Sequence, residues 1–153
     1  MSNKNVPIMI AFEGVDKSGK TTLIREFNKA TNFKYFVLDR FIISSLVYDK
    51  LFARGREKYY KKMIKKLKKA NVIVVFCNCS ESLVRKRLED ANEVLPKELN
   101  DINLVEDMFI ELIAEYESFF KGTISVCTNS SIESCVNRIV DGVENIERKM
   151  RCE

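Results

Sequence analysis

The sequence has no histidine, and it has only two prolines and five glycines among its 153 residues. The lack of histidine excludes a histidine general base, a phosphohistidine intermediate and the usual zinc ligand sets. No apolar run approaches the roughly 20 residues needed to span a membrane, and residues 1–5 are too short and too polar for a signal peptide. We therefore expect a cytoplasmic protein without a membrane partner.

Cysteine occurs without any pattern that points to a bridge or a metal. The five cysteines are odd in number and show no C-x-x-C spacing, which argues against a disulfide framework and a zinc site. Cys77 and Cys79 stand two residues apart at the end of an apolar run, so we expect both side chains on one face of a strand. Cys127 and Cys135 fall in apolar patterns. The sequence therefore predicts buried free thiols.

The composition is typical of one globular domain over residues 1–153, with 46% hydrophobic and 31% charged residues. The net charge of +4 is unevenly distributed. Residues 56–69 carry Arg56 and seven lysines against Glu57, so one segment holds the basic surplus. Such a segment is explained by the solvent-exposed face of an amphipathic helix. The alternative is that its lysines bind the phosphates of a nucleic acid.

A glycine-rich stretch at residues 12–22 fits the phosphate-binding pattern G-x-x-x-x-G-K-[ST]. It follows an apolar run at residues 6–12, which predicts a buried strand, and it leads into a helical pattern over residues 20–31. Gly14 and Gly19 allow backbone conformations in which successive N–H groups turn toward a phosphate chain. The start of the helix adds the positive end of its dipole.

The side chains of this loop suit a nucleoside triphosphate with Mg²⁺. Lys20 is expected to reach the β- and γ-phosphates as a point charge, and the Thr21 hydroxyl to hold Mg²⁺. The other predicted ATP-binding residues of the loop are Asp16, Lys17, Ser18 and Thr22.

Strands and helices are expected to alternate along the rest of the chain. We predict strands at residues 33–38, 72–77 and 123–127, and helices at residues 44–54, 56–70, 81–90, 101–120 and from 132 onward. A lid-like loop is expected at residues 91–100. This alternation predicts an α/β fold with a mostly parallel sheet of about four strands flanked by helices.

A second candidate motif, Asp39-Arg40, lies where the strand at residues 33–38 ends. In a parallel sheet, this position and the Gly14 loop lie at the same carboxyl edge. Asp39 can organise Mg²⁺ or accept the proton of an attacking oxygen, and Arg40 can bind phosphate oxygens with two parallel hydrogen bonds. An ordinary surface ion pair is the alternative interpretation.

Together the two motifs resemble those of the thymidylate kinase family of nucleoside monophosphate kinases. Residues 12–22 resemble the loop of that family, and residues 39–48, Asp-Arg-Phe-Ile-Ile-Ser-Ser-Leu-Val-Tyr, resemble its second motif. The resemblance implies a three-layer P-loop kinase fold, ATP with Mg²⁺, and transfer of a phosphoryl group to a deoxynucleoside monophosphate. The family often forms dimers, so pairing through residues 44–70 is a further hypothesis.

The resemblance also implies roles for single residues. Asp16 would meet the sugar 3′-hydroxyl of the acceptor, and Arg40 would bind the acceptor phosphate. Asp39 would serve the metal or the attacking oxygen. The residues expected to line the acceptor side are Ser44, Ser45 and Tyr48. In a nucleoside kinase, Asp39 or Glu13 would act as the base toward a 5′-hydroxyl.

Phosphoryl transfer also needs a cation near the transferred group, which this family supplies from the glycine loop or from the lid. The lid after Arg87 offers only Lys97, so Lys17 is our candidate. Arg85 and Arg87 are candidate contacts to adenine or phosphate, and a solvated helix face is the alternative for both.

The chain departs from the family between its first helix and Asp39. Residues 23–38 suffice for the end of one helix and one strand, so the additional strand and helix that hold the thymine base in the family have no counterpart. The acceptor base is therefore not predicted. Two other functions stay open: phosphorylation of a polynucleotide end, with residues 58–69 and Tyr59-Tyr60 binding nucleic acid, and ATP binding without transfer.

Overall fold

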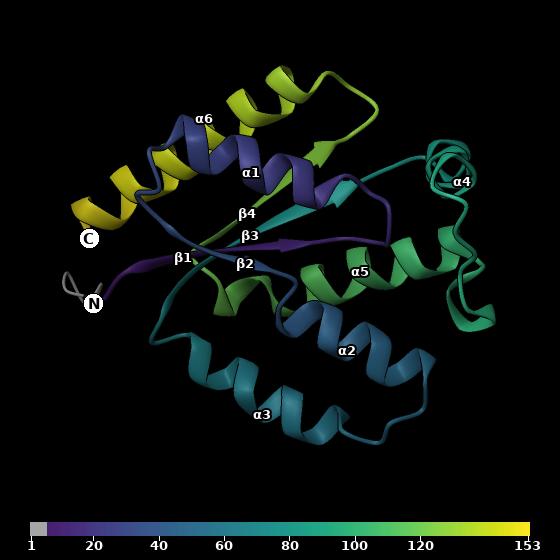
Figure 1. Cartoon of the computed structure of the whole chain (residues 1–153). Coiled ribbons are helices and arrows are strands. Elements are labelled where there is room, and N and C mark those ends of the chain that lie inside the picture. The colour runs from purple at the N-terminus through teal and green to yellow at the C-terminus, as the bar shows by residue number, and fades with distance from the viewer. Residues whose placement is uncertain (1–5) are drawn as a thin grey trace.

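The computed structural model describes residues 6–153 and shows an α/β fold with an all-parallel sheet (Figure 1). The strands are β1 (Ile8–Glu13), β2 (Phe36–Asp39), β3 (Asn71–Asn78) and β4 (Gly122–Cys127), and the sheet order is β2-β1-β3-β4. The helices are α1 (Lys20–Ala30), α2 (Ile42–Leu51), α3 (Glu57–Leu67), α4 (Glu81–Asp90), α5 (Ile102–Tyr116) and α6 (Ile132–Cys152). The predicted four-stranded parallel sheet is confirmed.

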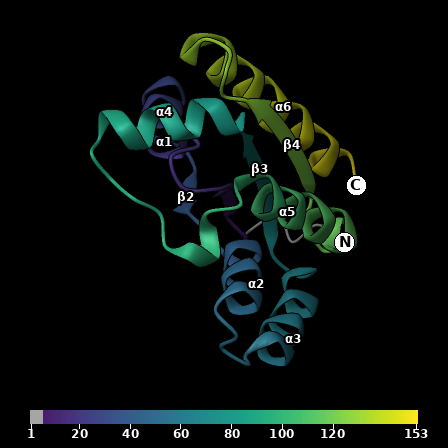
Figure 2. The ribbon, with the colours of Figure 1, turned by 90° about the vertical axis from the view of Figure 1, so that its right-hand side faces the viewer.

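Helices cover both faces of the sheet. α1 and α6 lie on one face, and α2, α3 and α5 lie on the other (Figures 1 and 2). The central strand β3 alternates between two cores: Ile73 and Val75 pack with the α1 and α6 side, and Val74 and Phe76 pack with the α2 and α5 side. This double burial explains why β3 reads as an unbroken apolar run.

Gly122 corrects one predicted boundary. Its spacing after the apolar stripe of α5 suggests a glycine that stops the helix. Instead, α5 ends at Tyr116 and Gly122 is the first residue of β4. A Cβ at Gly122 would lie 2.4 Å from Cδ1 of Ile146 on α6, so glycine lets this helix approach the strand closely.

The cysteines are free, as predicted, but two expectations about their positions are wrong. Cys77 packs in the α1 and α6 core, whereas Cys79 lies beyond the end of β3 in the opposite core. Cys127 is exposed, because its position on the edge strand β4 faces away from α6, as does Thr123. Burial raises the pKa of the Cys77 thiol to about 12.

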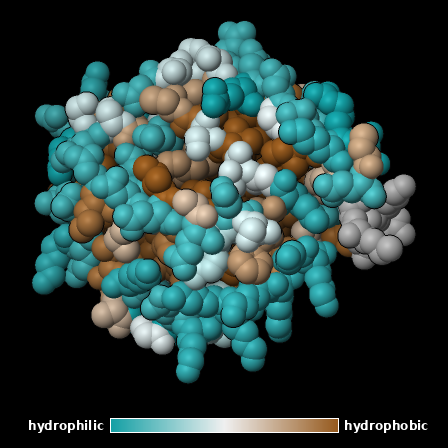
Figure 3. Space-filling view, turned by 180° about the vertical axis from the view of Figure 1, so that it is seen from behind, coloured by the Kyte–Doolittle hydropathy of each residue, from teal (hydrophilic) through white to brown (hydrophobic). Residues whose placement is uncertain are grey.

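The outer surface is mostly hydrophilic. The rear face of the molecule, on the β4 side, exposes hydrophobic side chains near its middle within a hydrophilic rim (Figure 3). α6 is the longest helix in the described chain, and charged residues occupy its outer side while Ile139 and Val143 are buried. Within residues 6–153, no helix combines the length and the apolar character that crossing a bilayer requires.

Candidate functional site

The glycine-rich loop joins the carboxyl end of β1 to the start of α1. Gly14 has φ +151°, and a Cβ there would lie 2.6 Å from the carbonyl oxygen of Cys77, so no other residue fits. Gly19 is the N-cap of α1 with φ +91°, and no side chain caps the first turn of this helix. The N–H groups at the start of α1 are therefore available to an anion.

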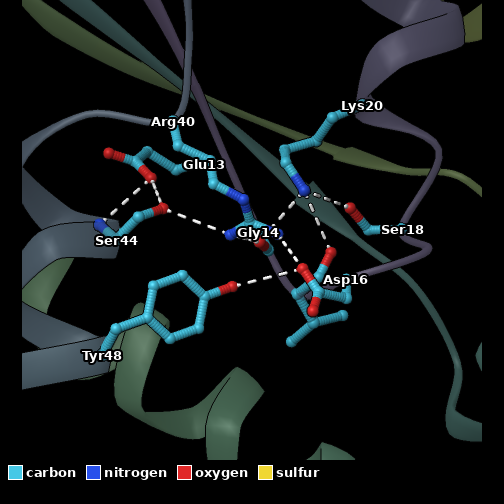
Figure 4. Close-up of polar contacts among 9 residues, drawn as sticks. Glu13, Gly14, Asp16, Ser18, Lys20, Arg40, Ser44 and Tyr48 are labelled. Atoms are coloured by element: carbon cyan, nitrogen blue, oxygen red, sulfur yellow. Dashed lines mark hydrogen bonds and ion pairs between the residues drawn. The ribbon is translucent and has the colours of Figure 1, made fainter. Parts of the chain in front are cut away.

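The side-chain nitrogen of Lys20 contacts both ends of this loop (Figure 4). Its Nζ donates hydrogen bonds to the carbonyl oxygens of Gly14 at 3.2 Å and Val15 at 3.0 Å, and to Oγ of Ser18 at 3.3 Å. Burial, with a smaller contribution from the nearby Arg40 charge, lowers the pKa of Lys20 to about 8. The three hydrogen bonds engage all three ammonium protons, so a phosphate oxygen that binds Lys20 would replace one of these loop contacts.

The second motif lies directly beside this loop. β2 pairs with β1 in a register that sets Asp39 opposite Phe12, and the Arg40 N–H donates to the Phe12 carbonyl at 2.9 Å. The Arg40 guanidinium donates to the carbonyl of Gly14 at 3.0 Å and forms an ion pair with Asp16 (Figure 4). The parallel sheet thus brings the two sequence motifs together at its carboxyl edge.

Glu13 does not line the cavity, where a base that acts on a bound nucleoside substrate would have to lie. Only 1% of it is exposed. One carboxylate oxygen accepts the N–H groups of Phe41 at 2.9 Å and Ile43 at 3.2 Å, and the other accepts the N–H of Ser44 at 3.1 Å and its hydroxyl. Glu13 therefore caps the N-terminus of α2, which has no side-chain cap of its own. Burial raises its pKa despite these hydrogen bonds.

The predicted acceptor-side residues of α2 divide into two groups. Ser44 is buried in the Glu13 network, and the Ser45 hydroxyl donates to the Phe41 carbonyl at 3.1 Å, so both are occupied by local contacts. Tyr48 instead faces the glycine loop. Its ring lies 5.0 Å from the Arg40 guanidinium carbon, its hydroxyl donates to Asp16 at 3.4 Å, and burial raises its pKa.

A cavity of about 830 Å³ opens in front of the glycine loop. Residues 16–22 of the loop line it together with Asp39 and Arg40. Residues of the loop expected as a lid also line it: Ala91, Glu93, Val94, Leu95 and Pro96. The lining residues that no sequence pattern predicted are Asp90, Thr128, Ser130, Ile132 and Cys135. Residues 128–132 follow the carboxyl end of β4, so the rule for parallel sheets was the signal that could have found them.

The basic residues predicted near ATP take different positions. Lys17 lines the cavity, and its Nζ lies 2.9 Å from Oε1 of Glu93. Arg87 also lines the cavity and donates to the Lys17 carbonyl at 2.8 Å. Arg85 does not line the cavity, because its guanidinium pairs with Glu81 at 2.8 Å and with the Asn100 carbonyl at 2.9 Å.

The donor set suits Mg²⁺ held partly by substrate. The exposed Thr21 hydroxyl and the Asp39 carboxylate line the same cavity. Among residues 6–153, no three cysteine, aspartate or glutamate side chains gather into a metal-binding group. Mg²⁺ commonly takes one or two protein oxygens and completes its shell with phosphates and water, so these two residues fit it.

The chain matches no model of a known protein family and no curated protein sequence. The loop, the second motif and the cavity that they share are therefore the observations that support a function.

Proposed function

We propose that the protein transfers the γ-phosphoryl group of ATP to a small nucleotide. The observation that best supports this proposal is that the glycine loop, with the uncapped start of α1, and the Asp39-Arg40 motif line the same cavity. Phosphoryl transfer depends on positioning and charge neutralisation more than on covalent chemistry. Donor and acceptor groups bound at these two motifs would meet in that cavity.

Each wall of the cavity has a part in this reaction. The loop N–H groups and Lys20 bind the donor phosphates, and Thr21 and Asp39 hold Mg²⁺, which neutralises phosphate charge when bound. Arg87 and residues 128–132 border the cavity on the α4 and β4 side, where the adenosine part of the donor would lie. Lys17 is our proposed cation for the transferred group.

A deoxynucleoside monophosphate is the acceptor that the resemblance to thymidylate kinases favours. Arg40, held against Asp16 beside the loop, is the cation that would bind its phosphate. In this proposal the molecule is a three-layer P-loop kinase in which β2 is the outermost strand. Only residues 31–35 connect α1 to β2, so the base-reading segment of the family has no place in this fold.

A nucleoside 5′-hydroxyl is the second candidate acceptor, and the local charge supports it. Arg40 lines the cavity together with Asp39 and already pairs with Asp16. Asp39 adds a second carboxylate. Two carboxylates beside Arg40 also suit a neutral hydroxyl that must give up a proton, which is the observation that supports a nucleoside as the second candidate.

The polynucleotide alternative gains no support from the position of the lysines. No residue of α3 lines the cavity, and this helix contacts α2 and the short turn Glu117–Phe119. Tyr59 is exposed, so a separate surface for nucleic acid stays a hypothesis, but it would lie away from the proposed transfer site.

Acceptor-dependent ADP formation tests the proposal. Mg-ATP is offered with deoxynucleoside and ribonucleoside monophosphates, free nucleosides and a 5′-hydroxyl oligonucleotide. Lys20→Ala and Asp39→Ala should abolish turnover, and Glu89→Gln, at an exposed site on α4, should retain it. Turnover with monophosphates alone supports the first acceptor, and turnover with nucleosides alone supports the second. ATP binding without turnover on any acceptor would refute the kinase and leave a nucleotide-binding protein.

A further inference from the structure

Lys17 and Glu93 connect two segments that are 76 positions apart in the sequence. The Lys17 ammonium in the glycine loop lies 2.9 Å from the Glu93 carboxylate, and both residues line the cavity. Their side chains are 32% and 54% exposed, so water screens the pair and weakens it. The cation that we assign to the transferred group is thus held by a carboxylate in this structure, but through a weak contact.

The backbones of both residues are held firmly, whereas their side chains share a single contact. Asn92 adopts φ +53° after the end of α4, and the Glu93 N–H donates to the Leu88 carbonyl at 2.9 Å. This is the usual C-terminal cap of a right-handed α-helix, in which the residue before Glu93 takes a left-handed backbone conformation. Lys17 has φ +61°, and Arg87 binds its carbonyl oxygen. The Glu93 carboxylate can therefore turn away without any change in the fold.

The charges that line the cavity are balanced. Four cations face four carboxylates: Lys17, Lys20, Arg40 and Arg87, and Asp16, Asp39, Asp90 and Glu93. An entering polyanion must separate a paired cation from its carboxylate before it can bind that cation. The Arg40 guanidinium pairs with Asp16 and also donates hydrogen bonds to Gly14 and Ser44. Because these contacts hold the guanidinium in place, the pair between Arg40 and Asp16 is hard to separate. The single contact between Lys17 and Glu93 is the easier one to break.

We propose that Glu93 sets the affinity of the site by occupying Lys17 until a triphosphate chain replaces it. This inference rests on the proposed nucleotide site. Because Glu93 competes for Lys17 and repels phosphate, its carboxylate weakens triphosphate binding. Removing that charge while keeping the shape of the side chain should therefore strengthen binding, and the gain should require Lys17.

Calorimetric titration with ATP and with inorganic triphosphate tests this inference without relying on turnover. Glu93→Gln should bind both ligands about two- to five-fold more tightly than the unsubstituted protein at low salt, the range expected for an exposed ion pair. The gain should shrink as salt is added. Glu89→Gln, which removes an exposed carboxylate one turn earlier, is the matched control and should change neither affinity.

Measuring Glu93→Gln in a Lys17→Met protein decides whether the gain in affinity depends on the ion pair between Lys17 and Glu93. Glu93→Gln should give no gain in Lys17→Met, and an equal gain there would overturn the inference, because it would reflect general charge alone. Unchanged or weaker binding by Glu93→Gln in the otherwise natural chain would also overturn it while leaving the nucleotide site intact. Failure of the unsubstituted protein to bind either ligand would overturn both proposals.

Discussion

The carboxylate of Glu13, the last residue of β1, accepts hydrogen bonds from both the N–H and the hydroxyl of Ser44, 31 positions later on α2. This contact joins the strand that carries the glycine loop to the helix that follows Asp39-Arg40 (Figure 4). It fixes the two motifs relative to each other in addition to the pairing of β1 with β2. Glu13 is thus a positioning residue for both motifs.

Glu13→Gln is expected to destabilise the protein by about 2–3 kcal/mol, because an amide nitrogen replaces one oxygen and leaves buried N–H groups of α2 without an acceptor. Chemical denaturation measures this change. Glu89→Gln, at an exposed position, should alter the free energy of unfolding by less than about 0.5 kcal/mol. Equal stability of the two variants would show that Glu13 does not hold α2.

ATP affinity is expected to fall as the pH rises through 8. Lys20 has a pKa of about 8 because it is buried, and phosphates bind its protonated form. Above that pH the free protein loses the proton that the complex needs, so affinity should drop by up to about tenfold per pH unit. Titrations between pH 6.5 and 9.5 measure the slope. Lys20→Met should bind weakly and without this slope, and an unchanged slope would assign the titration to another group.

Two of the five thiols are expected to react quickly with a water-soluble disulfide reagent. Cys127 and Cys152 are exposed, whereas the other three are buried and Cys77 has a pKa raised to about 12. Since the thiolate is the nucleophile, buried thiols react slowly. The double variant Cys127→Ser/Cys152→Ser should lose the fast phase, and all five thiols should react in denaturant. A fast phase in the double variant would contradict the burial of Cys77, Cys79 or Cys135.

Gly122→Ala is expected to cost about 1–3 kcal/mol, because its methyl group would overlap Ile146 and force α6 away from β4. Thermal or chemical denaturation measures the loss. Ile146→Val removes the Cδ1 atom that the new methyl group meets, so the double variant Gly122→Ala/Ile146→Val should be less destabilised than the two single costs predict together. Simple additivity would show that this contact is not the cause.

The fold was predictable because local patterns and sheet geometry agree. The unbroken apolar run before Cys77, the glycine loop after β1 and the helical spacing of α5 each specify one element. Ser80, directly before α4, caps this helix by accepting the Leu83 N–H. The boundaries of α2 and α5 were less predictable. Glu13 starts α2 two residues before the expected point, and no pattern within the helix itself contains that information.

The candidate site was predictable in part. Gly14, Gly19, Lys20 and Arg40 meet because parallel pairing of β1 and β2 brings their carboxyl ends together. The residues after β4 carry no local motif, although the rule for parallel strands places them at the same edge of the sheet. Glu93 lies in the loop expected as a lid, but only the tertiary structure shows that it meets Lys17. Glu13 and Ser44 belong to the expected motifs, yet their partners show that they bind each other rather than facing the cavity.

The amino-acid sequence by itself determined the order of strands and helices along the chain, the residues of the glycine-rich loop between β1 and α1, and the placement of Asp39-Arg40 at a strand end. Each of these depends on residues close together in the chain. The tertiary structure alone decided which charges meet. Glu13 caps α2, Glu93 binds Lys17, and Cys77 and Cys79 enter opposite cores. These outcomes depend on distances between remote segments, which local periodicity and spacing do not specify.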